Sequence, residues 1–282
     1  MNYQQILDIG CKNLKKNNIK NFSLESELIL SKALNNSREQ ILLNFKNFIN
    51  QNQINKFKNY LSRRIKKKEP IAYILGFKHF WKYKFLVNNS VLIPRPDTEL
   101  ILEECLKFIK INESKRVLDI GTGSGCIIIS LLKERSNCKA TALDVSKKAI
   151  NIAKTNAKLH HLENKIEFIN MDIDKYRSNK YDLILSNPPY VNSISLNRLD
   201  DDIKFHEPKL ALSGGFDGFS EIRKVINKSK KLLKNSGKLI IEIGYGQKNQ
   251  CLILLKKNGF YINKVKKDFS GIDRCIVSTK IS

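Results

Sequence analysis

The sequence predicts an α/β protein in which a small helical domain precedes a doubly wound, mostly parallel β-sheet. Three observations support this fold class. From residue 96 onward, short apolar runs of β-rich composition alternate with longer amphipathic stretches, as in chains that build βαβ units. The first 68 residues instead show helical periodicity and contain a single glycine. The length of 282 residues suits one large domain together with a small one.

Residues 1–70 are expected to form the helical domain. Ser23 is a suitable N-cap, and Glu25 and Glu27 follow it in the first turn, where acidic side chains are favoured by the helix dipole. A second stretch, 54–68, places four apolar side chains on one helical face, namely Ile54, Phe57, Leu61 and Ile65. We therefore predict a small bundle of packed helices.

Residues 71–95 differ in composition from the segments on either side. They are aromatic, partly alternate between apolar and polar residues, and are interrupted by Gly76 and by the triplet "NNS". We expect a β-hairpin that links the helical domain to the larger domain, residues 96–282.

The larger domain is expected to alternate between helix and strand. Strands are expected at 116–121, 139–146, 165–172, 181–189 and 238–246, with a terminal pair near 261–267 and 273–280. Helices are expected at 97–110, 126–135, 147–162 and 219–237, with one more before the terminal pair. Ligands of such sheets lie at the carboxyl ends of the strands, so the site is expected there.

The composition narrows the cellular setting. Six cysteines are scattered without CxxC spacing or partner histidines, so we expect no metal site and reduced thiols. The sequence starts with no apolar run of signal-peptide length, and no segment approaches the roughly 18 apolar residues of a membrane-spanning helix. These features predict a soluble cytoplasmic protein that does not enter membranes.

The formal net charge of +24 raises a nucleic-acid hypothesis. However, only ten of the 51 basic residues are arginine, and the chain is also rich in asparagine and isoleucine, a combination that A·T-rich coding produces. Proteins that read bases depend on arginine more than on lysine. The charge alone identifies no partner, and we do not expect nucleic acid to be the substrate.

A glycine-rich loop follows the strand expected at 116–121. In "LDIGTGSGC", Gly121, Gly123 and Gly125 stand between a strand and a helix, where glycine permits a tight turn and the helix N-terminus offers free N–H groups. A dinucleotide fingerprint would place its third glycine where this chain has Cys126. The GxGxG spacing therefore favours S-adenosylmethionine over a pyrophosphate cofactor.

Acidic residues stand at or near the ends of three strands of the predicted sheet. Asp144 stands where a carboxylate accepts both ribose hydroxyls, Asp172 is expected near the adenine, and Asp119 near the cofactor's ammonium group. An alternative for Asp144 and Asp172 is that they cap helices, and glycine-rich turns also occur without ligands. Three acidic residues at successive strand ends favour a bound cofactor.

The motif "NPPY", Asn187 to Tyr190, ends the strand expected at 181–189. A primary amide nitrogen is a poor nucleophile, so an enzyme that methylates one must hold both N–H groups and aim the nitrogen. The Asn187 side-chain oxygen and the Pro188 carbonyl would be the two acceptors, and Tyr190 would pack on the planar group. Proline adds a carbonyl without adding a donor. The alternative is a simple strand terminator in a proline-rich turn.

With these motifs the sequence resembles the amino-directed class I methyltransferases. Within that group it is similar to the peptide chain release factor N5-glutamine methyltransferases, the PrmC/HemK family. The resemblance covers nearly the whole chain, through "EPIAYILGFKHFW", "LIPRPDTE", "LDIGTGSG", "ALDVS", "SNPPYV", "HEPKLALSGGFDG" and "IEIGYGQ". It implies a seven-stranded Rossmann-like sheet, S-adenosyl-L-methionine as cofactor, and methylation of the glutamine in the Gly-Gly-Gln motif of class 1 release factors during translation termination.

Two segments distinguish this family from its relatives. "PRPDTE" is typical of the release-factor enzymes, whereas the enzymes that methylate a glutamine of ribosomal protein L3 usually carry a "PRSP"-like segment. "EPKLALSGGFDG" is shared by both glutamine enzymes and is not expected in DNA methyltransferases. The L3 enzymes and a nucleic-acid adenine-N6 methyltransferase are the alternatives.

The resemblance also implies the site residues. Those expected to contact the cofactor are Asp119, Gly121, Thr122, Gly123, Ser124, Gly125, Asp144, Asp172 and Asn187. Those expected to hold the glutamine are Asn187, Pro188, Pro189 and Tyr190, with Asn187 and Pro188 as the catalytic residues. We expect the N-terminal helices to dock the release factor and the enzyme to be monomeric. Glu207 and Glu242 receive no role from the sequence.

Overall fold

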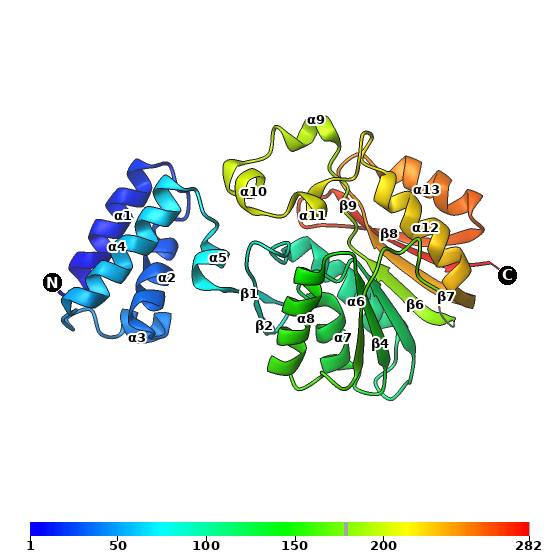
Figure 1. Cartoon of the computed structure of the whole chain (residues 1–282), viewed down its shortest axis with the longest axis horizontal. Helices are drawn as coiled ribbons and strands as arrows, with labels where there is room; N and C mark the ends of the chain where they lie inside the picture. Colours follow the sequence, from blue (N-terminus) through cyan, green and yellow to red (C-terminus); the bar gives the residue numbers. More distant parts are fainter. Residues whose placement is uncertain (178–179, 282) are drawn as a thin grey trace. The chain divides into compact units, whose positions relative to one another are not determined.

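The computed structural model describes residues 1–177 and 180–281 (Figure 1). The chain divides into two compact units. One contains Met1–Phe77 together with Asp200–His206, and the other contains Lys78–Leu199 together with Glu207–Ser282. Residues 178, 179 and 282, which fall in the predicted larger domain, lie outside the described residues. No helix in the described part of the chain is long and apolar enough to cross a membrane.

The first unit is helical, as the sequence predicts. Its helices are α1 (Tyr3–Lys16), α2 (Phe22–Leu34), α3 (Arg38–Leu42), α4 (Gln51–Lys66), α5 (Ile71–Leu75) and α10 (Asp201–His206). The apolar faces of α1 to α4 form a separate core, in which Ile29, Leu30 and Phe57 are fully buried. The predicted cap at Ser23 is wrong, because α2 already begins at Phe22 and Asn21 is its N-cap.

The segment 71–95 contains a hairpin, made by β1 (Phe77–Phe80) and β2 (Tyr83–Leu86). Phe80 and Phe85 are buried in a core of the second unit. Most of the hairpin therefore belongs to the larger unit, whereas α5 belongs to the first.

The second unit contains a seven-stranded sheet in the order β5-β4-β3-β6-β7-β9-β8. Its strands are β3 (Arg116–Ile120), β4 (Lys139–Asp144), β5 (Ile166–Asn170), β6 (Tyr181–Ser186), β7 (Leu233–Glu242), β8 (Phe260–Lys267) and β9 (Asp273–Lys280). The first five strands in this order pair in parallel, and β9 runs antiparallel to both of its neighbours. The fold class predicted from the sequence is confirmed.

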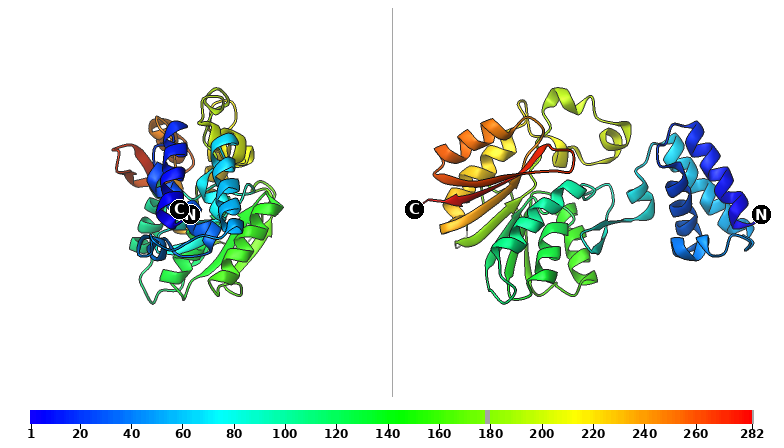
Figure 2. Two further views of the ribbon diagram at one scale, coloured as in Figure 1. Left: turned by 90° about the vertical axis from the view of Figure 1, so that its left-hand side faces the viewer. Right: turned by 180° about the vertical axis from the view of Figure 1, so that it is seen from behind.

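Helices cover both faces of this sheet (Figure 2). Helices α6 (Glu99–Phe108), α7 (Cys126–Glu134) and α8 (Lys147–Leu159) share one core with it, and α12 (Ser220–Leu232) and α13 (Lys248–Lys257) share the other. The remaining pieces are short: η1 (Pro96–Thr98), α9 (Ser193–Leu196) and α11 (Lys209–Leu212). The predicted helix 219–237 is too long, because its last residues already belong to β7.

The order of the strands fixes the place of the site. In the sheet, β4 and β5 lie on one side of β3. The chain then crosses to β6, which lies beside β3 on its other side. The carboxyl ends of β3 and β6 therefore lie at a switch point, where open α/β sheets bind their ligands.

Candidate active site

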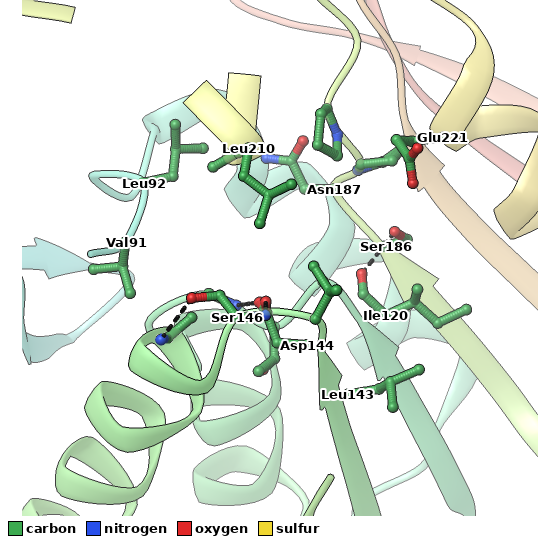
Figure 3. Close-up of a pocket in the computed structure, with 18 of the residues that line it drawn as sticks. Val91, Leu92, Ile120, Leu143, Asp144, Ser146, Ser186, Asn187, Leu210 and Glu221 are labelled. Atoms are coloured by element: carbon green, nitrogen blue, oxygen red, sulfur yellow. Dashed lines mark hydrogen bonds between the residues drawn. The ribbon is translucent and has the colours of Figure 1, made fainter. Parts of the chain in front are cut away.

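A cavity of about 250 Å³ lies at the carboxyl ends of β3, β4 and β6 (Figure 3). Nine of its lining residues are site residues that the sequence predicts: Gly121, Thr122, Gly123, Ser124, Asp144, Asp172, Asn187, Pro188 and Pro189. Figure 3 shows Asp144 and Ser146 on one side of the cavity, with Asn187 and Leu210 across from them. The structure thus brings residues from four separate segments to one place.

Two of the three loop glycines leave open space in the cavity. Gly121 and Gly123 have φ angles of +74° and +55°, a conformation that residues with a side chain rarely adopt. A Cβ added at Gly121 would meet no atom within 4 Å, and one at Gly123 would meet only a carbonyl at 4.0 Å. A ligand can therefore approach the backbone closely here.

Gly125 has a different role, because it does not line the cavity. A Cβ at this position would lie 2.8 Å from Ile129 Cδ1 and 3.3 Å from Ala153 Cβ. Gly125 is the N-cap of α7 with a φ of +79°. It permits the turn and the close packing of α7 against α8.

Asp144 lines the cavity and also holds the loop in place. Its Oδ2 accepts a hydrogen bond from the Gly123 N–H at 2.9 Å, and its Oδ1 accepts one from the Ser146 N–H at 2.8 Å. Burial raises the pKa of this carboxyl above its ordinary value. The side-chain N-cap of α8 is Ser146 rather than Asp144.

Asp172 lines the same cavity from the loop after β5. Its Oδ1 accepts a hydrogen bond from the Asp174 N–H at 2.8 Å, which fixes a local turn. The apolar neighbours Met171 and Ile173 also line the cavity. This end of the cavity therefore combines an acceptor with an apolar surface.

Asp119 lies beneath the loop and outside the cavity lining. It is fully buried, and its Oδ2 accepts a hydrogen bond from the Thr122 hydroxyl at 2.7 Å. Among the described residues, Oδ1 has no hydrogen-bond partner. Burial raises the pKa of Asp119 to about 7, and the nearby Asp144 carboxylate adds to the rise.

Asn187 belongs to a chain of hydrogen bonds. Its Nδ2 donates to Thr98 Oγ1 at 3.0 Å, and the Thr98 hydroxyl donates to Glu242 Oε2 at 2.7 Å. The Tyr190 hydroxyl donates to Glu242 Oε1 at 3.2 Å. Burial raises the pKa of Glu242 to about 7. The sequence assigned no role to Glu242, although Thr98 is part of the quoted "PRPDTE" motif.

Tyr190 does not line the cavity. Its ring lies against Gly244, where an added Cβ would be 2.8 Å from Tyr190 Cδ2. Burial raises the pKa of its hydroxyl, and the Glu242 carboxylate adds to the rise. In this structure Tyr190 therefore supports Glu242 instead of covering the cavity.

Glu207, also without a role from the sequence, joins two segments that border the cavity. Its side chain is 1% exposed, and its carboxylate accepts hydrogen bonds from Arg95 Nη2 at 2.5 Å and from the Ile93 N–H at 3.2 Å. Arg95 lines the cavity, as does Pro208, which follows Glu207. This ion pair fixes one wall of the site.

Two protein families match parts of the chain. Residues 5–76 match the family described as the PrmC N-terminal domain, and residues 97–200 match the methyltransferase small domain.

Within the described residues, no group of three or more His, Cys, Asp or Glu side chains is arranged to hold a metal ion.

Curated relatives match over most of the chain. The release factor glutamine methyltransferase of Clostridium acetobutylicum is 35% identical over 95% of this chain and 94% of its own length. That of Buchnera aphidicola is 37% identical over 92% of each chain. A bifunctional methyltransferase of Rickettsia felis is 34% identical over 99% of this chain, which spans 58% of that relative's length.

Solved structures with a similar fold have lower sequence identity. A methyltransferase from Pyrococcus furiosus has a TM-score of 0.53 at 20% identity. The match covers 70% of this chain and 89% of that protein's chain. A ribosomal protein L11 methylase from Lactobacillus delbrueckii has a TM-score of 0.52 at 18% identity, covering 68% and 83%. These similarities concern the fold of the sheet domain.

The raised pKa of Asp119 predicts a pH-dependent stability. In the folded chain the protonated carboxyl is favoured. Its contribution to the free energy of unfolding is therefore full below the pKa of the unfolded chain, near 4, and is lost as the pH rises through about 7. The unfolding free energy of the wild type, minus that of Asp119→Asn, should therefore fall by a few kcal/mol between about pH 4 and pH 7. Urea unfolding across this range measures it, and a flat difference would contradict the assignment.

Proposed function

The chain belongs to the family of release factor glutamine methyltransferases, and we propose that it methylates the glutamine side-chain amide of a peptide chain release factor. S-adenosyl-L-methionine is the proposed methyl donor. The observation that carries the proposal is the position of Asn187, which borders the cavity and has its amide nitrogen bound to Thr98. This arrangement leaves the amide oxygen to accept a hydrogen bond from a substrate.

The residues around the cavity fit the proposed cofactor. Gly121 and Gly123 leave space for a ligand at the backbone, and Asp144 places a carboxylate beside that space. Asp119 keeps one buried oxygen without a hydrogen-bond partner among the described residues, and an ordered water between this oxygen and a donor of the cofactor would satisfy it. When bound, the cofactor supplies an electrophilic methyl group on a sulfonium.

The substrate amide needs orientation more than activation. In the proposed complex, Asn187 Oδ1 and the Pro188 carbonyl accept hydrogen bonds from the two N–H groups of the glutamine. Each bond contributes about 1 kcal/mol net, whereas correct placement of the reacting groups lowers a barrier by about 7 to 11 kcal/mol. The same two oxygens stabilise the positive charge that develops on the nitrogen. The methylated cation then loses its proton to water.

The helical unit is the proposed docking domain for the release factor. Residues 5–76 match the PrmC N-terminal domain family, and this unit has its own hydrophobic core. We further propose a monomeric enzyme that acts in the cytoplasm, where translation terminates. Sedimentation of the purified chain as a stable dimer would contradict the proposed monomer.

The substrate assignment is tested by transfer of a labelled methyl group. Mixed with labelled S-adenosyl-L-methionine and an unmethylated release factor, the protein should label the glutamine of the Gly-Gly-Gln motif. A release factor with that glutamine replaced is the control. Label that survives the replacement, or that enters ribosomal protein L3, DNA or RNA instead, would contradict the proposal.

For Asn187→Ala, methyl transfer should fall by about 10²- to 10³-fold, because one of the two acceptors that hold the amide is removed. The fold should be retained, as measured by circular dichroism and thermal unfolding. Asn258→Ala is a matched control, since this asparagine follows α13 and its side chain donates only to the Leu254 carbonyl in the described structure. Turnover of Asn187→Ala near the wild-type value would refute the role.

Docking by the helical unit predicts a difference between substrates. An intact release factor should have a kcat/KM at least about tenfold higher than a short peptide that contains the Gly-Gly-Gln motif, because a second contact raises the effective concentration of the glutamine. Steady-state kinetics with both substrates measure the ratio. Equal values would remove the docking role.

A further inference from the structure

We propose that Glu242 is a positioning residue, which acts through Thr98 to fix the end of the Asn187 amide that faces the substrate. This inference rests on the proposed function, because it concerns the acceptor that holds the target amide. It assigns a role to a buried carboxylate that the proposed reaction does not otherwise use.

Three elements meet at Glu242. The residue ends β7, is 2% exposed, and binds the Thr98 hydroxyl of η1 and the Tyr190 hydroxyl of the loop after β6. Thr98, itself 3% exposed, connects the carboxylate to Asn187. Thr98 is therefore the single residue that connects Glu242 to Asn187 by hydrogen bonds.

The direction of the hydrogen bonds follows from the carboxylate. An ionised carboxylate only accepts, so Thr98 must direct its single hydroxyl proton to Glu242. Only the lone pairs of Thr98 Oγ1 then remain for Asn187, which must present its Nδ2–H₂ group. The amide oxygen of Asn187 is consequently turned away from Thr98.

This direction matters because the two ends of an asparagine amide have nearly the same shape. The terminal torsion of asparagine is roughly two-fold, so sterics alone do not choose between the orientations. A flipped Asn187 would present N–H groups to the N–H groups of the target amide, and the acceptor would be lost. The charge of Glu242 selects the useful orientation before the substrate arrives.

The protonation state of Glu242 should control this selection. Besides Thr98 and Tyr190, the groups that face it are Arg274 and Cys275 of β9 and Asp97 of η1. Burial, aided by Asp97 and opposed by Thr98, Tyr190 and Arg274, raises its pKa to about 7. Once protonated, the carboxyl can donate to Thr98, whose hydroxyl proton is then free to point to Asn187. The constraint on the amide is thus released below about pH 7.

The experiment compares Glu242→Gln with the wild-type enzyme on release factor. The neutral amide can donate to Thr98, so kcat should fall about tenfold while the KM for S-adenosyl-L-methionine stays unchanged. The wild type should lose kcat as the pH falls through about 7, and the variant should lack this step. A kcat within twofold of wild type, or an unchanged step in the variant, overturns the inference.

Thr98 and a second buried carboxylate supply the matched variants. Thr98→Val should lower kcat as Glu242→Gln does, the double variant should lose no more, and Thr98→Ser should retain activity. Glu104→Gln removes a buried carboxylate that pairs with Lys107 and Lys264, and it should keep the wild-type pH profile. Additive losses in the double variant overturn the inference.

A measurement on the free protein separates this inference from the proposed function. In protein labelled with ¹⁵N-asparagine, the side-chain amide resonance of Asn187 is assigned by its absence from the spectrum of Asn187→Ala. This resonance should shift with a midpoint near pH 7 in the wild type. In Glu242→Gln it should stay at the same position across the pH range. A resonance insensitive to pH in the wild type overturns the inference. Absence of methyl transfer by the wild type would instead refute the proposed function, and would leave this resonance shift as the test of Glu242.

Discussion

The parallel pairing of β3 with β4 on one side and β6 on the other is the constraint on which the site depends. Ile120 pairs with Leu143 and with Ser186, so the three strands end at the same level. The Ser186 hydroxyl also donates to the Ile120 carbonyl at 2.8 Å. Neighbouring strands lie about 4.8 Å apart, so the residues that directly follow β3, β4 and β6 lie close together at this edge of the sheet.

A half-buried carboxylate and a buried one, Asp144 and Glu242, then hold the loops that leave this edge. Asp144 accepts the Gly123 N–H, and Glu242 accepts the hydroxyls of Thr98 and Tyr190. Burial raises the pKa of both carboxyls, so their ionised forms reduce the stability of the folded chain. The benefit is a set of polar groups with fixed directions before any ligand binds, which is how an enzyme stabilises charge that develops during a reaction.

The sequence predicted those parts of the site that local patterns specify. The glycine loop and Asn187 directly follow apolar strands and Asp144 ends one, and a strand end is visible in the order of residues. The predicted positions of Asp119 and Tyr190 depended on the direction of a side chain instead. Asp119 points beneath the loop to Thr122, and the Tyr190 ring packs on Gly244, which is distant in the sequence. The Asp119–Thr122 contact joins residues three apart, but the sequence does not show that the carboxylate turns away from the cavity, and no local pattern encodes the packing of Tyr190 on Gly244.

By itself, the sequence determined the alternation of strands and helices, the separate helical segment and the motifs that carry the family resemblance, because each depends on neighbouring residues. Only the tertiary structure decided that Thr98, Asn187 and Glu242 form one chain of hydrogen bonds. These residues come from three distant segments and meet only when the sheet and its loops are folded. Through Thr98, the direction of the Asn187 amide depends on Glu242, a carboxylate that is distant from Asn187 in the sequence.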